Sequence, residues 1–369
     1  MNKKIRMIGA LVLAVLWLGL SVFAWVRPSD ELSVSERRKL DQFPKLTWKT
    51  FTNVKFMEGF EDYTLDQFPF RDTFRRLKAQ FHTKVMLQRD NNDIYIADGY
   101  AAEMAYPMDE ASVDRAVSQF NKVYEMYLKD TGSKVVATVV PDKGYYLAEK
   151  NGYLAFDYQE MFNKVENGMP WAEYVDITDC LTIEDYYYTD THWRQEEILP
   201  VAQKLSGALG VTAPQADDFT VTALERPFYG VYYGQAALPM DPETMYIMQS
   251  DLLNDCTVYI YDDKGIKATE VYDEQNLDSL DQYDIYLSGP QSIVRIENPN
   301  ATTDRELIVF RDSYGGSLVP LLVQDYAVVT LVDIRSNYIM PERLGAFIEF
   351  NGQDVLFMYS SLVLNKNLI

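Results

Sequence analysis

Two residue types that often build reactive sites are scarce in this chain of 369 residues, which has two histidines and two cysteines. The cysteines, Cys180 and Cys256, allow one disulfide at most, and the sequence does not show whether they pair. The sequence contains no Cys/His cluster with zinc spacing, no His-Glu-x-x-His and no phosphate-binding glycine loop. We therefore expect no metal and no cofactor.

Positive charge is also scarce. The chain has 34 Lys and Arg residues against 55 Asp and Glu, a formal net charge of −21 and a pI of about 4.5. Such a surface repels nucleic acid, so we expect no nucleic-acid partner. The hydrophobic share of 47% supports a folded core. The aromatic share of 14% suits carbohydrate stacking, but it equally suits any aromatic-lined fold.

Only one long apolar run is present, from Met7 to Val26, and it follows three basic residues, Lys3, Lys4 and Arg6. Twenty residues without a charge are enough to cross a bilayer as a helix. A cleaved signal peptide is the alternative, because Ser21–Ala24 offers small residues at a cleavage site. We predict an uncleaved signal anchor in the cell membrane, with the rest of the chain on the extracytoplasmic side.

The first half of the exported region alternates helical and extended patterns. Residues Asn91–Tyr100 predict a strand with an Asp-Gly hairpin turn. Ser112 is the expected N-cap of a helix that Gly132 ends. The run Val135–Val140 is typical of a buried parallel strand, and Lys143 follows its carboxyl end, where open α/β sheets place ligands.

The residue pattern of the second half changes from helical to β-rich in its middle. A helix is expected from Arg194 to Leu209, followed by a β-rich insertion at about 219–298. The apolar strands Leu307–Phe310, Ala327–Val332 and Val355–Tyr359 then alternate with short helical segments, which predicts a mostly parallel sheet. The expected organisation is a cytoplasmic tail (1–6), a transmembrane helix (7–26), a linker (27–50) and one extracytoplasmic domain (51–369).

A candidate triad joins two distant segments. Asp190 lies two residues before His192, so its carboxylate can reach the imidazole if the backbone is extended. Ser313 follows the strand ending at Phe310 and precedes a Gly-rich turn, at the carboxyl edge where chemistry is expected. The alternative is a structural histidine and an ordinary turn serine.

These residues resemble the DHHW proteins, which are relatives of the alginate O-acetylation proteins and more distantly of the SGNH hydrolases. The resemblance covers almost the whole exported region. It is carried by Tyr188–Trp193 and Val309–Tyr314, with support from Phe68-Pro69-Phe70-Arg71, Val140–Lys143, Phe228-Tyr229-Gly230 and Val332–Arg335. It implies a three-layer α/β/α SGNH-hydrolase-like domain whose Asp-His element precedes the serine in sequence.

By match to the alginate relatives, the resemblance assigns Asp190, His192 and Ser313 to the catalytic triad. The turn after the serine has glycines where many relatives are expected to have Asn, so backbone N–H groups of Ser313, Tyr314 or Gly315 are the expected oxyanion donors. Two further candidates for positioning the substrate are Arg335 and Lys143. For both of these the alternative is a salt bridge at the sheet edge.

The function that the resemblance implies is serine acyl transfer or acyl-ester hydrolysis on a cell-surface or exported polysaccharide, most simply O-acetylation. A membrane-bound O-acyltransferase partner would supply the acyl groups. Two rivals stand beside it: a non-catalytic surface protein that binds glycan, and a glycosidase. The first predicts a separation beyond about 5 Å between the histidine and serine side chains. The second requires two cleft carboxylates about 5–10 Å apart.

Overall fold

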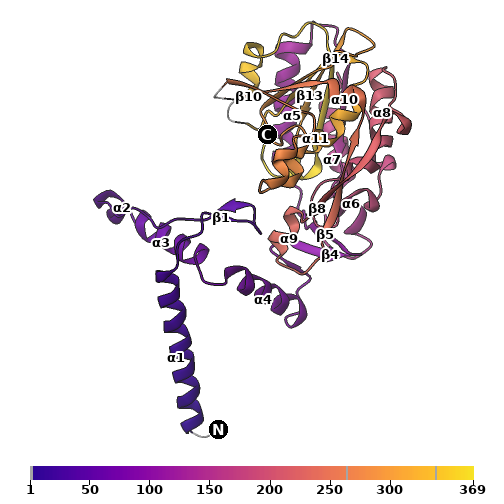
Figure 1. The fold of residues 1–369 in the computed structure, drawn as a ribbon. Helices are drawn as coiled ribbons and strands as arrows, with labels where there is room; N and C mark the ends of the chain where they lie inside the picture. Colours follow the sequence, from indigo (N-terminus) through magenta and orange to yellow (C-terminus); the bar gives the residue numbers. More distant parts are fainter. Residues whose placement is uncertain (1–2, 263–264, 337–338) are drawn as a thin grey trace. The chain divides into compact units, whose positions relative to one another are not determined.

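The computed structural model describes residues 3–262, 265–336 and 339–369. The chain folds as two compact units (Figure 1). The N-terminal unit consists of residues 1–91 with 233–239, and the sheet unit consists of residues 92–232 with 240–369.

The N-terminal unit is mostly helical. Its helix α1 (Lys3–Val26) is long and apolar enough to cross a membrane, by length and composition, and a signal sequence near an N-terminus has the same features. The remaining elements are the short strands β1 (Leu32–Ser33), β2 (Arg38–Lys39) and β3 (Asp90–Asn91), and the helices α2 (Trp48–Thr52), α3 (Lys55–Asp66) and α4 (Arg71–Lys84). Residues 67–70 separate α3 from α4.

Ion pairs hold the segment after α1 onto these helices. Arg38 donates to the carboxylate of Asp66 at 2.7 Å, and Arg71 and Arg75 pair with Glu36. The hydrogen bond from Arg38 holds the pKa of Asp66 below its ordinary value although burial opposes it. The N-terminal unit is thus fastened by charge more than by a large apolar core.

The sheet unit is built on an eight-stranded sheet in the order β11-β10-β12-β14-β13-β15-β6-β7. The strands are β6 (Val135–Val140), β7 (Glu173–Tyr174), β10 (Thr257–Asp262), β11 (Gly265–Thr269), β12 (Ile293–Glu297), β13 (Arg305–Arg311), β14 (Tyr326–Val332) and β15 (Asp354–Ser360). The five strands from β14 to β7 run parallel, and β12, β10 and β11 add antiparallel pairs at one edge. This confirms the predicted mostly parallel sheet.

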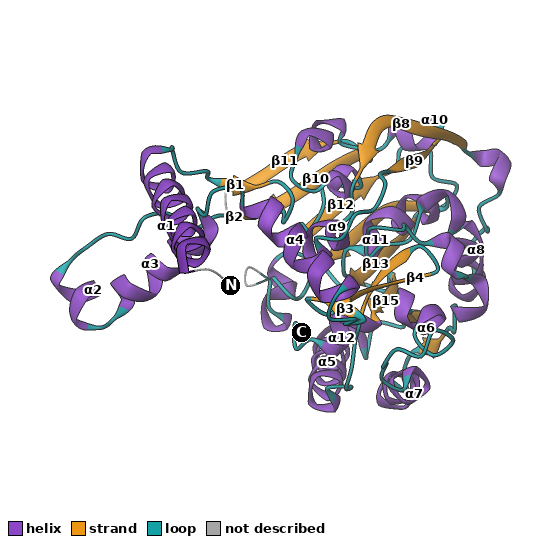
Figure 2. Ribbon diagram, turned by 90° about the horizontal axis from the view of Figure 1, so that it is seen from below, coloured by secondary structure: helices purple, strands orange, loops and turns teal. Residues whose placement is uncertain are grey.

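Strand β6 shows why the fold has three layers. Its six residues are all buried, and alternate side chains enter different cores. Val136 and Val140 pack in one core with Leu205 of α8 (Leu199–Leu209), and Ala137 and Val139 pack in the other with Phe120 of α5 (Glu110–Val123). Helix α7 (Tyr158–Gly168) lies beside α5 in this second layer (Figure 2).

Smaller elements surround the sheet. A hairpin of β4 (Ile94–Ala97) and β5 (Tyr100–Glu103) turns at Asp98-Gly99, which confirms the predicted hairpin. In segment 219–298, β8 (Thr220–Phe228) and β9 (Glu243–Gln249) pair as an antiparallel ribbon, and β10, β11 and β12 join the main sheet. The short helices are α6 (Lys143–Leu147), α9 (Val231–Ala236), α10 (Asp251–Asp255), α11 (Tyr314–Leu318) and α12 (Ser361–Asn365).

Two predicted helix boundaries are wrong. The N-cap of α5 is Asp109, whose carboxylate accepts the Ser112 N–H at 2.9 Å, and α5 passes into a π turn at Tyr124–Leu128 well before Gly132. The helix predicted from Arg194 begins with a 3₁₀ turn, and α8 starts only at Leu199 with a proline in its first turn. It ends as predicted at Gly210, which adopts a positive φ of 69°.

Candidate active site

Ser313 lies two residues after β13, an inner strand of the parallel part of the sheet. Strand β13 ends at Arg311 between β14 and β15, so the serine emerges at the carboxyl edge, and α11 begins at the next residue. Asp312 fixes this turn: its carboxylate accepts the N–H of Tyr314 at 3.0 Å and the N–H of Ser360 at 2.7 Å. A Cβ on Gly315 would lie 2.8 Å from the Arg311 side chain, so this turn requires a glycine there.

His192 lies in a short closed loop. Tyr186 and Trp193 form an antiparallel bridge, and the N–H of Tyr187 donates to the His192 carbonyl at 3.1 Å. Inside the loop the Asp190 carboxylate accepts two hydrogen bonds on one oxygen, from His192 Nδ1 at 2.6 Å and from the His192 backbone N–H at 3.1 Å. The backbone is therefore a turn stabilised by an Asp side chain, and the extended conformation assumed in the prediction is wrong.

The structure brings the three predicted catalytic residues together. His192 Nε2 lies 2.7 Å from Ser313 Oγ, while its Nδ1 faces the Asp190 carboxylate. A carboxylate can only accept, so Nδ1 carries the proton and Nε2 offers its lone pair to the serine hydroxyl. Asp190 is fully buried and His192 is 7% exposed, so water competes little for either group.

Two neighbouring segments hold the histidine loop from outside. Glu243, at the start of β9, accepts the N–H of Thr189 at 2.8 Å, the Thr189 hydroxyl at 2.7 Å and the N–H of Tyr188 at 2.5 Å. The other Asp190 oxygen accepts the N–H of Val231 at 2.8 Å. Gly230 lies so close that a Cβ there would be 2.3 Å from the Asp190 backbone. The carboxylate of Asp190 is thus fixed on both oxygens.

Lys143 supports the same loop from beneath. It is 2% exposed, and its ammonium donates to the carbonyls of Tyr187 at 2.9 Å and Tyr188 at 3.3 Å. Burial lowers the pKa of Lys143 to about 7, and it raises the pKa of Glu243 above its ordinary value. Lys143 donates hydrogen bonds to carbonyls of the loop and Glu243 accepts hydrogen bonds from N–H groups of the loop. Together the two side chains fix the loop backbone. Lys143 therefore binds the histidine loop through backbone carbonyls.

Aromatic side chains fix the plane of the imidazole. The Tyr283 ring is stacked on His192 with centroids 3.8 Å apart and planes 7° apart. Its hydroxyl lies 2.7 Å from Ser317 Oγ, which also accepts the Trp193 indole N–H at 2.9 Å. Burial raises the pKa of Tyr283 well above its ordinary range, so the phenol stays neutral beside the histidine.

The predicted positioning residues occupy different places. Tyr314 donates its hydroxyl to the Thr191 carbonyl at 2.5 Å, and its own N–H and that of Gly315 are engaged with Asp312. In the part of the chain that the structure describes, the N–H of Ser313 donates no hydrogen bond. Arg335 makes two hydrogen bonds to Asp333, at 2.8 and 2.6 Å, which is the salt bridge considered as its alternative.

Neither cysteine contributes to this site. Cys180 and Cys256 are both free thiols, and burial raises the pKa of the Cys256 thiol to about 11. Within residues 3–262, 265–336 and 339–369, no group of three or more His, Cys, Asp or Glu side chains could hold a metal ion.

Comparisons with known proteins point to one family. The family model for DHHW proteins matches residues 158–332, a range that contains Asp190, His192 and Ser313. The resemblance to the DHHW proteins is confirmed. None of the curated protein sequences matches this chain.

The first two of the following solved structures share the fold of this chain. A DHHW family protein from Eubacterium siraeum is 23% identical with a TM-score of 0.59, and the match covers 76% of this chain and 94% of that one. PatB1 from Bacillus cereus is 18% identical with a TM-score of 0.60, covering 74% and 98%. The O-acetyltransferase domain of AlgJ from Pseudomonas putida is 15% identical with a TM-score of 0.44, covering 74% and 92%.

Sequence reasoning missed several residues that hold this site. Glu243 lies 54 residues after Thr189, and nothing in its local sequence marks it as a partner of the loop. Tyr283 lies among many other tyrosines, so its stacking on His192 has no local signal. Gly230 belongs to the motif Phe228-Tyr229-Gly230, and the close approach of its backbone to Asp190 explains why glycine occupies this position.

Proposed function

We propose that the chain is a membrane-anchored extracytoplasmic serine acyltransferase or acylesterase that acts on a cell-surface or exported polysaccharide, most simply in O-acetylation. The observation that carries the proposal is the continuous line from the Asp190 carboxylate through His192 to Ser313, at 2.6 and 2.7 Å. Such a line activates a serine for attack on a carbonyl. The polysaccharide follows from the DHHW resemblance.

In the proposed first step, His192 Nε2 removes the Ser313 proton as Oγ attacks the carbonyl carbon of an acyl donor. The carbonyl oxygen becomes an oxyanion, for which the Ser313 N–H is the proposed donor. The tetrahedral adduct collapses, the leaving group takes the proton from His192, and an acyl-serine remains. Asp190 orients the ring and stabilises the imidazolium.

In the second step a sugar hydroxyl attacks the acyl-serine. His192 takes its proton, the ester bond to Ser313 breaks, and the serine recovers its proton. Water in place of the sugar gives hydrolysis. By resemblance, the acyl donor in the cell would be loaded by a membrane-bound O-acyltransferase.

The rivals fit the structure less well. A non-catalytic glycan-binding protein needs no reactive pair, and it predicts a histidine and serine more than about 5 Å apart. The 2.7 Å between His192 and Ser313 speaks against it. A glycosidase requires two cleft carboxylates about 5–10 Å apart, whereas the Asp190 carboxylate is bonded to His192 on one oxygen and to the N–H of Val231 on the other.

The anchor part of the proposal rests on α1. Its apolar run of 20 residues follows three basic residues, and this order supports an orientation with the sheet unit outside the cytoplasm. Loss of an intact N-terminus from the mature membrane-bound protein, measured by intact mass, would contradict the uncleaved anchor.

Turnover of 4-nitrophenyl acetate by the full chain in detergent tests the proposal. We expect Ser313→Ala and His192→Ala each to lower kcat by about 10³-fold or more, with thermal unfolding unchanged. Ser133→Ala is the matched control, because Ser133 lies at the amino end of β6, on the opposite edge of the sheet. Wild-type turnover in Ser313→Ala would refute the proposed nucleophile.

A further inference from the structure

A second surface, in the N-terminal unit, has no role in the proposed chemistry. Between residues 43 and 65 this unit exposes large apolar side chains that a protein normally covers, and Trp48 is 81% exposed. Extensive exposed apolar area often marks a site of contact with a protein or a membrane. The exposed group is Phe43, Leu46, Trp48, Phe51, Val54, Met57 and Leu65, and we call it the apolar surface.

The apolar surface belongs to a folded segment. Thr47 and Thr50 form a capping box at the start of α2, and the rings of Trp48 and Phe51 lie 6.3 Å apart. The ring of Phe43 packs edge-on against Phe56, Phe60 and Tyr63 of α3, at 5.3 to 6.3 Å. The exposure therefore results from the way the segment folds.

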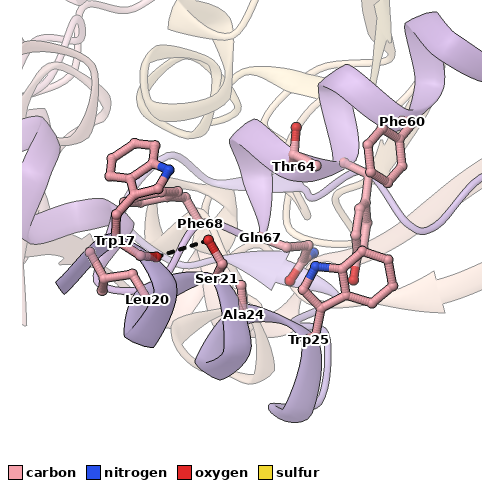
Figure 3. A pocket seen from close by; sticks show the side chains of 10 residues that line it. Trp17, Leu20, Ser21, Ala24, Trp25, Phe60, Thr64, Gln67 and Phe68 are labelled. Carbon is pink, nitrogen blue, oxygen red and sulfur yellow. Dashed lines mark hydrogen bonds between the residues drawn. The ribbon is translucent and has the colours of Figure 1, made fainter. Parts of the chain in front are cut away.

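Helix α3 lies alongside the last turns of α1. A cavity of about 190 Å³ separates them, and Figure 3 shows Trp17 and Trp25 on its α1 side and Phe60 and Thr64 on its α3 side. Trp17 and Trp25 are about 12 Å apart along the helix axis. A bilayer that contains α1 up to Trp25 therefore meets α3 at its surface. This gives the apolar surface a specific neighbour, the lipid next to α1.

The lysines of this segment are separated from its acidic residues. Lys45, Lys49 and Lys55 are exposed beside Trp48 and Phe51, and the acidic residues of the segment follow them at Glu58, Glu61, Asp62 and Asp66. From Arg27 to Asn91 the chain has 13 basic and 10 acidic residues, whereas the rest has 18 basic and 45 acidic. A segment that combines aromatic side chains with lysines is typical of structures that lie in the interface plane of a membrane and are attracted by anionic lipid.

We propose that residues 43–68 lie in the plane of the membrane, with the apolar surface in contact with anionic lipid as a second attachment beside α1. A membrane-protein partner is the rival occupant. The exposed lysines and the continuity with α1 favour lipid, because both complement a bilayer without any further protein. The proposal rests on the membrane anchor proposed for α1, and it goes beyond the proposed acyl chemistry, which needs no contact of this surface.

Spin labels on the full chain test it. Cys180→Ser and Cys256→Ser remove the native thiols, and Phe51→Cys or Met57→Cys then carries the label in proteoliposomes of phosphatidylcholine and phosphatidylglycerol. Glu160→Cys, exposed on α7 of the sheet unit, is the aqueous control. We expect the ratio of collisions with oxygen to collisions with a water-soluble nickel chelate to be at least about threefold higher at the first two sites than at the control.

A second set of measurements tests the role of the lysines. In vesicles of phosphatidylcholine alone, or with Lys45, Lys49 and Lys55 all changed to Gln, the ratio at residue 51 should fall toward that of the control. Turnover of 4-nitrophenyl acetate by each labelled chain, unchanged from the parent, establishes that the sheet unit is folded. Ratios equal to the control at both sites in anionic vesicles would overturn the proposal and leave the surface to a protein partner. An unchanged ratio in the triple variant would overturn the role of charge.

Discussion

The two units of this molecule differ in their charge and in how far their apolar side chains are exposed. The sheet unit holds most of the acidic excess, and its apolar side chains lie in two extensive cores on the two faces of one sheet. The N-terminal unit has a basic excess and exposes side chains such as Trp48 and Phe51. A stable scaffold for chemistry buries its aromatics and a surface for attachment displays them.

The chemistry that we propose belongs to the sheet unit alone. The hydrogen bonds and ring contacts described for the triad involve residues of the sheet unit, including Glu243 and Val231. The comparison therefore predicts that changes beside the histidine loop abolish or reduce activity, whereas changes on the apolar surface leave the turnover of a soluble ester intact.

The largest of these effects is expected at Gly230. In Gly230→Ala the new Cβ would overlap the Asp190 backbone, so the loop must shift and the line to Ser313 breaks. We expect kcat on 4-nitrophenyl acetate to fall by about 100-fold. Gly207→Ala is the control, because Gly207 lies in α8 with open space around it. Equal turnover in both variants would show that the close approach does not matter.

A smaller loss is expected at Glu243. Glu243→Gln keeps the size of the side chain but replaces one accepting oxygen with an NH₂ group, which cannot accept the N–H of the loop. We expect kcat to fall by about tenfold with KM little changed, because the loop orients the base without touching substrate. Glu225→Gln, exposed on β8, should behave as wild type. A change confined to KM would contradict the positioning role.

Lys143 gives a pH-dependent effect on stability. Burial lowers its pKa from 10.5 to about 7, although Glu243, Asp190 and Asp142 oppose the shift. Between these values the unfolded chain binds more protons at this side chain than the folded one, so its contribution to stability rises with pH. We expect the stability of wild type relative to Lys143→Met, from denaturant unfolding, to increase between pH 6.5 and pH 9. A difference that is flat or falls over this range would mean that the ammonium stays charged in the fold.

The smallest effect is expected in the N-terminal unit. Trp48→Ala and Phe51→Ala remove exposed rings of the N-terminal unit, whereas the triad belongs to the sheet unit, so turnover of 4-nitrophenyl acetate in detergent should stay within about twofold of wild type. A large loss of kcat in either variant would break the separation of roles between the two units.

The sheet was predictable because its strands are continuous apolar runs. Val135–Val140 is β6 with the same bounds, and Leu307–Phe310 lies inside β13. The N-cap of α5 was not predictable, because Asp109 and Ser112 are both residue types that favour an N-cap. The choice depends on a distant partner: Ser112 donates its hydroxyl to the Leu364 carbonyl at 2.6 Å, and Asp109 is left as the cap.

The site divides in the same way. Asp190 and His192 are two residues apart, so their pairing was readable from local sequence, even though a turn rather than an extended strand brings them together. Ser313 was placed by its strand. Glu243 and Tyr283 were not predictable, because their contacts arise only when β8, β9 and the segment before β12 fold over the loop.

The central claim is that His192 activates Ser313, and covalent trapping tests it most directly. A sulfonyl fluoride is a suitable probe, because it reacts with a serine oxygen that a neighbouring base activates. The serine oxygen would form a bond to sulfur, fluoride would leave and the proton would pass to His192.

The measurement is the rate and position of sulfonylation by phenylmethanesulfonyl fluoride, followed by intact mass and peptide mapping. The account predicts one adduct per chain, on Ser313, formed at least about 100-fold more slowly in His192→Gln. An adduct on another residue, or equal rates in wild type and His192→Gln, would contradict it.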